Sequence, residues 1–368
     1  MTNLNLKIIA YASFICWLSF ACSKDNDEDM VPYTPQTNWE KSKGLEEGIF
    51  NSLYIDNKLY LLGASNFYKD GNISDTNIPF SFEKYITRPG WHKLPVSNKV
   101  LATRTELDVF ILSVSNLTED QFLKIDLKSF DPTFIKLEDI PRWQSEGLGI
   151  SGNGTILIPY RTAKEGIAEN NPSLMLIRTS NKNNEIVIEE VKNIKLQVLS
   201  YYDLVYQVDS FENFFLITVG NIVIQLTDQG EVSTVGAFNT LRSLIIKDEV
   251  ISFGIDRIKN EVSYFKSRMD GGNRQLVRKI PLEPLFDGLE LTSINDKIIG
   301  YKNDKIYLIE LETNKMKLSE LNNSKLEGGF ITSIISINEN KVLVTATCHI
   351  ICGGYTKPLN NFFEIKKE

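Results

Sequence analysis

The sequence has few of the residues on which metal and redox sites depend. It contains two histidines, His92 and His349, and four cysteines among 368 residues. Two histidines cannot build a multi-histidine metal centre, so we expect no metal site and no cofactor. Basic residues are also fewer than acidic ones. The chain has 40 Lys and Arg against 47 Asp and Glu, which gives a net charge of −7. Nucleic acid is therefore not an expected partner, because its phosphates require a basic surface.

Helical periodicity and catalytic motifs are missing too. After residue 38 no amphipathic run with a 3.6-residue period reaches helical length. No G-x-S-x-G elbow, Walker-type loop or H-E-x-x-H pair occurs. Acidic residues are too numerous for the sequence to single out a carboxylate pair of the kind that glycosidases use. The sequence thus predicts no catalytic residue, and it favours an all-β fold.

The N-terminus carries a targeting signal. Lys7 precedes the apolar stretch IIAYASFICWLSFA, whose 14 residues are too few to cross a bilayer core, which takes about 20. The stretch ends at Ala21, and Cys22 follows. This ending resembles the lipobox of bacterial lipoproteins. The resemblance implies that residues 1–21 are a signal peptide and that Cys22 is acylated and held in outer-membrane lipid.

The sequence leaves alternatives to this interpretation open. Leu18 lies four residues before Cys22, where a lipobox has its leucine three residues before. Cys16 is a rival lipidation site, although bulky Phe14 and Ile15 precede it. An ordinary secretory signal or an uncleaved anchor would also have this composition.

An acidic run follows Cys22. It resembles the surface-export signal of lipoproteins from the Bacteroidetes group, and the matching residues are Lys24, Asp25, Asp27, Glu28 and Asp29. The resemblance implies a place on the cell surface, with a periplasm-facing protein as the alternative. A like-charged run also serves as a plain solvated spacer. In either case residues 22–37 are predicted to be an acidic lipidated tether.

Two features recur after residue 37. Trp39, Trp91 and Trp143 are spaced 52 residues apart. Strand–turn–strand units with alternating apolar residues also recur, and their turns lie about 47 residues apart on average. These units are found at residues 52–63, 101–114, 148–159, 205–219, 243–254, 291–301 and 333–346.

Second hairpins follow several of these units, at 221–235, 262–280 and 305–321. Two hairpins make a four-stranded antiparallel sheet, and radial repetition of such sheets is a β-propeller. We predict that residues 38–368 form a seven-bladed propeller domain, with six blades as the alternative. A closed ring needs its ends joined. We expect a strand from residues 39–50 to complete the last blade beside a strand at 360–368.

The first repeats resemble degenerate kelch repeats. NWEKSKGLEEGIFNSLYIDNKLYLLGA and GWHKLPVSNKVLATRTELDVFILSV share the kelch order of tryptophan, loop and hairpin, with Arg104 near the usual arginine. The resemblance implies that tryptophan lies on an outer strand and packs between blades. Stacking of these tryptophans on a sugar ring is the alternative. Gly63 alone remains of the paired kelch glycines in its repeat, and tryptophan is lost after the third repeat.

Two cysteines near the C-terminus lie four residues apart, in TCHIICGG. Outside the cytoplasm Cys348 and Cys352 could form a local disulfide, and buried free thiols are the alternative. With His349 they offer three donors, one fewer than a structural zinc site takes.

The predicted function is that of a membrane-anchored surface lipoprotein with a binding or scaffold role. Loops at one mouth of the ring would recognise a glycan, a peptide or another outer-membrane protein. The alternative is a propeller enzyme of the glycoside hydrolase or polysaccharide lyase type. A structural subunit of a surface complex is a third hypothesis.

Overall fold

The computed structural model describes residues 39–366 apart from 43–46, 56, 64–66, 70–71, 74–89, 95–98, 107–108, 116–119, 133, 136–148, 165–166, 183–184, 197–204, 323–325, 327, 338 and 348–352. The described residues are mostly β-strand, which confirms the prediction of an all-β fold. Their helices are the short α2 (Leu127–Phe130), η3 (Phe286–Gly288) and α3 (Leu359–Phe362). None of these described helices has the length and hydrophobicity needed to cross a bilayer.

The described strands pair into seven antiparallel sheets. The first two contain β2 (Ile49–Ile55), β3 (Lys58–Gly63), β4 (Phe67–Lys69) and β5 (Asn72–Ile73), and then β6 (Gly90–Leu94), β7 (Lys99–Glu106), β8 (Val109–Ser115) and β9 (Asp120–Asp126). The third sheet has five strands, β10 (Phe134–Ile135), β11 (Gly149–Ile150), β12 (Thr155–Lys164), β13 (Ile167–Lys182) and β14 (Glu185–Lys195).

The remaining sheets have four strands each. The fourth and fifth contain β15 (Val205–Ser210), β16 (Phe214–Val219), β17 (Ile222–Thr227) and β18 (Val232–Ala237), and then β19 (Thr240–Ile246), β20 (Glu249–Asp256), β21 (Glu261–Arg268) and β22 (Gln275–Pro281). The sixth contains β23 (Glu290–Ile294), β24 (Lys297–Lys302), β25 (Lys305–Leu311) and β26 (Met316–Glu320). The last contains β27 (Phe330–Ser336), β28 (Lys341–Thr347), β29 (Gly353–Pro358) and β1 (Glu40–Lys41).

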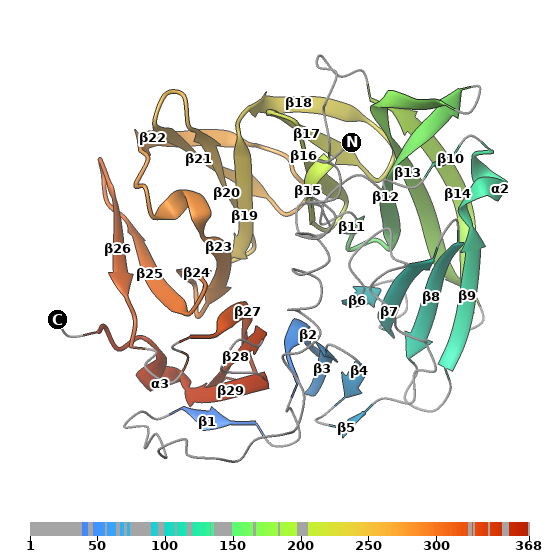
Figure 1. The fold of residues 1–368 in the computed structure, drawn as a ribbon. Coiled ribbons are helices and arrows are strands. Elements are labelled where there is room, and N and C mark those ends of the chain that lie inside the picture. Colours follow the sequence, from blue (N-terminus) through green and yellow to red (C-terminus); the bar gives the residue numbers. More distant parts are fainter. Residues whose placement is uncertain are drawn as a thin grey trace, which may run out of the picture.

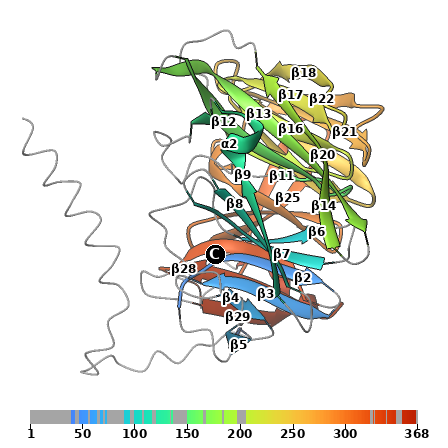
Figure 2. The same ribbon diagram turned by 90° about the vertical axis from the view of Figure 1, so that its right-hand side faces the viewer.

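The sheets are arranged around a central axis, which makes the fold a β-propeller. Figure 1 looks along this axis and shows β2, β6, β15, β19, β23 and β27 nearest the centre of their sheets, with later strands further out. In the third sheet the strand nearest the centre is β11. Neighbouring first strands contact one another, as β2 does with both β27 and β6. Figure 2 shows the same molecule from the side, where the first and last sheets again lie next to each other. The predicted propeller fold is confirmed at this level.

The hairpins form where the sequence predicts them because their turn residues tolerate a left-handed backbone. Lys247 and Asp248 have φ of 49° and 62°, and Asn295 and Asp296 have φ of 49° and 60°. Two successive residues with positive φ make the type I′ turn, whose twist matches that of paired strands. Asn and Asp adopt this conformation more readily than most residues.

Burial follows the radial position of each strand. The second strand β16 is buried along its whole length and β24 is buried except at its two end residues, whereas the outermost strands β18 and β22 are largely exposed. A strand buried on both faces needs a nearly continuous apolar sequence, and FFLITV in β16 has one. The core is therefore distributed between sheets.

Each described core cluster joins two neighbouring sheets. Phe214 and Leu216 of the fourth sheet pack with Leu241 and Val250 of the fifth. Further clusters join the third sheet to the fourth, the fifth to the sixth, the sixth to the last, and the last to the first. Burial of apolar side chains between sheets stabilises the ring by about 25 cal/mol per Å² removed from water.

One aromatic ring makes a close contact with backbone between the fourth and fifth sheets. Phe238 follows β18 and covers Gly236 and Gly254 so closely that a Cβ on either glycine would lie 2.6 Å from a ring carbon. The ring also meets Phe265 edge to face at 5.7 Å. Only glycine leaves room for this packing.

The N-terminal strand closes the ring. β1 pairs with β29 antiparallel, with Glu40 opposite Thr356 and Lys41 opposite Tyr355. This confirms that a segment within residues 39–50 completes the last sheet. The expected C-terminal strand at 360–368 is wrong in position, since the third strand is β29 and residues 359–362 form α3. Pro358 ends β29, because proline has no amide proton to continue the ladder.

The tryptophan spacing does not mark equivalent positions. Trp39 directly precedes β1 in the outermost position of its sheet, as expected. Trp91 lies on β6, the innermost strand of its sheet, opposite Ala102, so its predicted outer position is wrong. Trp143 lies outside the described residues. The regular spacing therefore reflects sheet length and not a shared radial position.

Candidate functional site

The first strands of four sheets carry the same short sequence pattern. A polar residue is followed by serine and then by leucine or isoleucine, in Asn51-Ser52-Leu53, Arg242-Ser243-Leu244, Thr292-Ser293-Ile294 and Thr332-Ser333-Ile334. Because these strands lie nearest the axis, the pattern places polar groups on successive sheets around the centre. We call these polar groups, together with Gln207 of β15, the inner-strand belt.

Hydroxyl groups of the belt join the first sheet to the last. The hydroxyls of Ser52 and Ser333 hydrogen-bond each other at 2.5 Å, and Ser333 also bonds Thr345 of β28 at 2.6 Å. Thr332 donates its hydroxyl to the carbonyl of Ile49. These half-buried groups have partners in neighbouring sheets, which removes the cost of leaving them unsatisfied.

The belt continues around the ring to the fifth and sixth sheets. The Thr292 hydroxyl donates to the carbonyl of Ile334 at 3.3 Å, which joins the sixth sheet to the last. The Ser293 hydroxyl donates to the carbonyl of Ile245 at 2.9 Å, which joins the sixth sheet to the fifth. Side chains thus provide the hydrogen bonds that neighbouring first strands do not form as a sheet.

Arg242 is the charged centre of the belt. Its Nη1 donates to Oε1 of Gln207 at 2.8 Å, and its Nε donates to the carbonyl of Leu289 at 3.2 Å. Its Nη2 lies 3.4 Å from Oε1 of Glu290, whose side chain is 55% exposed, against 19% for Arg242. The Gln207 amide in turn donates to Oδ1 of Asp209 at 2.6 Å. One guanidinium therefore links three sheets and presents an exposed carboxylate beside it.

A second charged group borders the same mouth of the ring. Arg257 Nε donates to Oδ2 of Asp287 at 2.7 Å, and its Nη2 donates to the hydroxyl of Thr240, the first residue of β19, at 3.4 Å. This end of the ring carries the connections between sheets and the turns between second and third strands. We call it the connection face and call the opposite end the hairpin face.

Exposed apolar side chains also occur on the connection face. Ile258, at the tip of the β20–β21 turn, is 92% exposed, and Leu285 just before η3 is 55% exposed. The turn is held in place, because Asp256 accepts from both the backbone and the Nζ of Lys259. The connection face thus carries fixed charged side chains and accessible apolar side chains together.

The hairpin face contains a buried carboxylate. Asp228 is 6% exposed, and its Oδ2 accepts from Nδ2 of Asn153 at 3.1 Å. Burial raises the pKa of Asp228, although hydrogen bonds from Ser151, Asn153 and Thr155 oppose that shift. The strand–turn–strand unit predicted at 148–159 has its turn here, where the Gly154 amide donates to the Ser151 carbonyl and Gly154 has a φ of 80°. This group joins two sheets and offers no open surface.

A shallow hollow lies at the outer rim and not at the axis. It has a volume of about 760 Å³ and is lined by Arg278 and the β25–β26 turn. Arg278 donates to the carbonyls of Glu312 and Thr313 at 2.8 and 3.4 Å, so its guanidinium is already engaged there. The connection face offers both charged and exposed apolar side chains, whereas the arginine of this hollow is already hydrogen-bonded.

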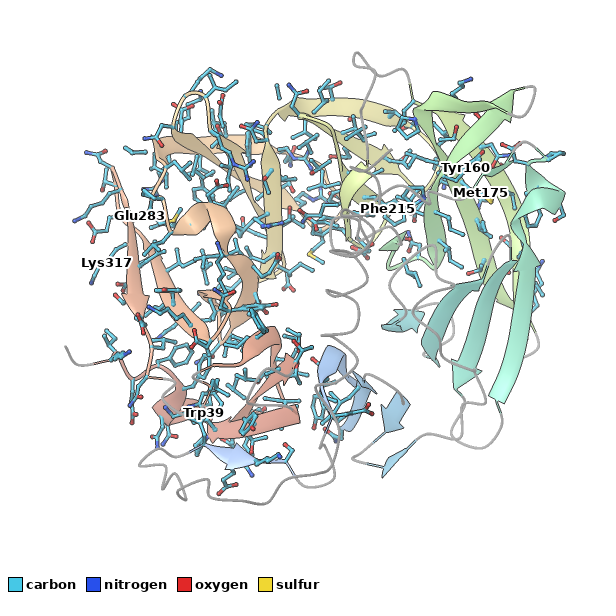
Figure 3. All side chains as sticks on the ribbon, viewed as in Figure 1. Trp39, Tyr160, Met175, Phe215, Glu283 and Lys317 are labelled. Atoms are coloured by element: carbon cyan, nitrogen blue, oxygen red, sulfur yellow. The ribbon has the colours of Figure 1, made fainter. Side chains whose placement is uncertain are left out.

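Trp39 is the one predicted aromatic residue whose side chain is described. It is 1% exposed and meets Phe362 edge to face at 6.3 Å, within a cluster shared by the last two sheets. Figure 3 shows Trp39 against the last sheet. The packing interpretation is confirmed for this residue, and a buried ring cannot stack on a sugar.

The other predicted site residues lie outside the described residues. They are the lipidation site Cys22, the export-signal residues Lys24, Asp25, Asp27, Glu28 and Asp29, and the cysteines Cys348 and Cys352. The described residues contain no group of three or more His, Cys, Asp and Glu side chains that could hold a metal ion. Sequence reasoning missed Arg242 and Gln207, although the repeated polar-serine pattern was a usable signal.

Comparisons with known proteins show fold similarity alone. No family model matches the chain, and no curated protein matches it in sequence. The extracellular domain of a putative one-component system from B. thetaiotaomicron is 10% identical, with a TM-score of 0.48 over 88% of this chain and 40% of that chain. The WD40 domain of Neurospora crassa Pan2 is 11% identical, with a TM-score of 0.45 over 91% of this chain and 100% of that chain. The β-propeller domain of the Trilobed protease from Pyrococcus furiosus is 9% identical, with a TM-score of 0.44 over 84% and 93%.

Proposed function

We propose that this protein is a lipid-anchored outer-membrane protein whose seven-bladed propeller binds a partner through its connection face. The seven sheets and the contacts between their first strands support seven blades. The lipobox-like ending at Cys22 and the acidic run behind it support the anchor and a place on the cell surface. The partner would be a glycan, a peptide or another outer-membrane protein.

The observation that carries the binding role is the Arg242 group at the connection face. Arg242 is fixed by bonds to Gln207 and to the carbonyl of Leu289, while its neighbour Glu290 remains exposed. A rigid cation beside an accessible carboxylate recognises hydroxyl and amide groups without a further cost of ordering the protein. Glycans and peptides both present such groups.

The anchor is tested by metabolic labelling with a radioactive fatty acid in bacteria that make the full chain. The parent chain should incorporate label and sediment with outer membranes, and Cys22→Ala should do neither. Cys16→Ala is the matched control and should behave as the parent. Loss of fatty-acid label in Cys16→Ala, with label retained in Cys22→Ala, would overturn the assignment of Cys22. Protease treatment of intact cells then distinguishes a surface protein from a periplasm-facing one.

Binding is tested with the full chain in detergent on a glycan array and on an array of random peptides. Glu290→Gln should weaken any specific signal, while Glu249→Gln, at the β19–β20 turn on the hairpin face, should leave it unchanged. If Glu290→Gln leaves the binding signal on the arrays unchanged, the binding site does not include Glu290. Release of reducing ends from an arrayed glycan would favour an enzyme over a binding protein.

A further inference from the structure

The outermost strands of the described sheets differ in how well their open edges are protected. Each outermost strand has one edge whose backbone groups pair with no other strand in its sheet. Charged side chains on such an edge discourage the addition of another strand. The described outermost strands with five or more residues are β9, β14, β18, β22 and β26.

Within that set, β18 is the strand without any charged side chain. Its sequence is VSTVGA, whereas β22 carries Arg278 and Lys279, and β26 carries Lys317 and Glu320. Figure 1 shows β18 at the rim of the ring, and Figure 3 labels Lys317 on the rim strand of another sheet. The usual protection against strand addition is therefore missing from one described edge.

The β18 edge is accessible, and Val232, Thr234 and Val235 are of types that favour strands. Residues 232–234 are exposed, and the Val232 side chain is 46% exposed. Val and Thr are enriched in strands because branched side chains pack well on a pleated surface. The strand contains no proline, which would remove a backbone donor.

A bulge does not account for the difference between β18 and its counterparts. In β18, Gly236 pairs with Val223 and Thr234 pairs with Ile224 of β17, so Val235 between them has no partner and forms a bulge. The same shift occurs in β22 at Val277 and in β14 at Glu189. Bulges twist an edge and weaken pairing, but these three strands share that protection. Charge is what sets β18 apart.

We propose that the β18 edge is the site where a second copy of this chain docks, with the two β18 strands antiparallel about a two-fold axis. A neutral strand is complementary to itself, because no register of the pair places like charges opposite each other. A two-fold axis then makes every contact twice. Charged edges such as β22 would bring Arg278 and Lys279 of two copies together. The proposal depends on neither the lipid anchor nor the ligand.

The dimer is expected to depend on concentration. One strand pair buries less area than the interfaces of stable complexes, so a weak and reversible association follows. The full chain in detergent is measured by sedimentation velocity from about 1 µM to about 200 µM, where weak dimers are populated. Thr234→Lys adds a charge to the β18 edge and should raise the dissociation constant about tenfold or more. Gln275→Lys adds the same charge to β22 and should leave it unchanged.

Cysteine cross-linking in intact cells that make the full chain shows whether β18 is the contact. Ser233→Cys should give an oxidised product of twice the chain mass, while Gln275→Cys should give no more than the parent, whose own cysteines set the background. Each variant must melt at the temperature of the parent, which excludes misfolding as the cause. A monomer at the highest concentration overturns the proposal, and so does a dimer that Thr234→Lys leaves intact. A Ser233→Cys product with any other mass assigns the edge to a different protein and also overturns it.

Discussion

The ammonium group of Lys357 lies 5.5 Å from the centre of the Trp39 ring, where β1 pairs with β29. Lys357 also lies 3.5 Å from Glu364 and donates to the carbonyl of Asn322 at 3.3 Å, although its side chain is only 1% exposed. A buried lysine is costly unless its charge is compensated, and here a ring face, a carboxylate and a carbonyl compensate it. The closure of the ring is thus a packed joint as well as a strand pair.

Removal of the Trp39 ring should destabilise the closure strongly. Trp39→Ala is expected to lower the free energy of unfolding by about 3–5 kcal/mol, because a fully buried tryptophan leaves a large cavity. Trp39→Phe should cost less, since it keeps the edge-to-face contact with Phe362. Urea unfolding of both variants measures the difference. Equal losses for the two variants would show that the ring is not packed as described.

Replacement of Lys357 should change how stability depends on pH in the alkaline range. Burial lowers the pKa of Lys357, and Glu364 opposes that shift. Between the lowered pKa of the folded state and the unfolded pKa of about 10.4, the unfolded state binds more protons than the folded state. The free energy of unfolding therefore increases as pH rises through this range. Lys357→Met removes this gain, so the parent should improve relative to the variant as pH rises through that window. Lys341→Met, which makes the same substitution at an exposed position, is the control variant.

Asp228 should make stability fall between acidic and neutral pH. Burial raises its pKa, so the folded state holds the proton at pH values where the unfolded state, with a pKa of about 3.9, has lost it. Stability from this group is present below about pH 3.9 and is lost as pH rises through the folded pKa. Asp228→Asn should therefore be more stable than the parent at pH 7, and this advantage should vanish near pH 4. Glu231→Gln, which changes an exposed carboxylate in the same turn, is the control variant.

Arg242 and Gln207 should be energetically coupled across two sheets. A double-mutant cycle with Arg242→Ala and Gln207→Ala should give an interaction energy of about 0.5–3 kcal/mol, the range for side chains in one hydrogen-bond network. The exposed pair Lys266 and Glu249 lies 2.9 Å apart and should give about 0.2–1 kcal/mol. Denaturant unfolding of the variants supplies the free energies. Full additivity for Arg242 and Gln207 would contradict a joint between sheets.

Gly254 should not tolerate a methyl group. A Cβ there would lie 2.6 Å from Phe238, and overpacking of this kind costs about 1–3 kcal/mol. Gly288→Ala is the matched control, because the group nearest its Cβ is the end of the flexible Lys302 side chain, which can move aside. The double variant Gly254→Ala with Phe238→Ala should lose less than the sum of the single changes. Thermal unfolding gives the comparison.

Local structure could be predicted from the sequence because its causes are local. The hairpins at 52–63 and 243–254 follow from alternation and from turn residues that accept positive φ, and both form. The closing strand was predictable from a topological need, since an open ring would leave apolar sheet faces exposed. Its partner was misplaced because residues 360–368 look like a strand, whereas Pro358 has already ended one.

Radial position and contacts between sheets could not be predicted. The spacing of Trp39 and Trp91 gives no information on whether a residue lies on an inner or an outer strand. The Arg242 group depends on the distance between β15, β19 and β23, and no local pattern encodes that distance. The polar-serine repeat signals inner strands, but only the fold shows which neighbour each hydroxyl meets.

The short pairing of β1 with β29 determines how the molecule would respond to force. Tension applied at Trp39 acts first on its buried ring and on the two paired residues Glu40 and Lys41. A strand pair this short resists little force by itself. The buried Trp39 indole and its contact with Lys357 therefore supply most of the resistance to detachment. Detachment of this joint would expose the apolar flank of the last sheet while the other sheets keep their neighbours.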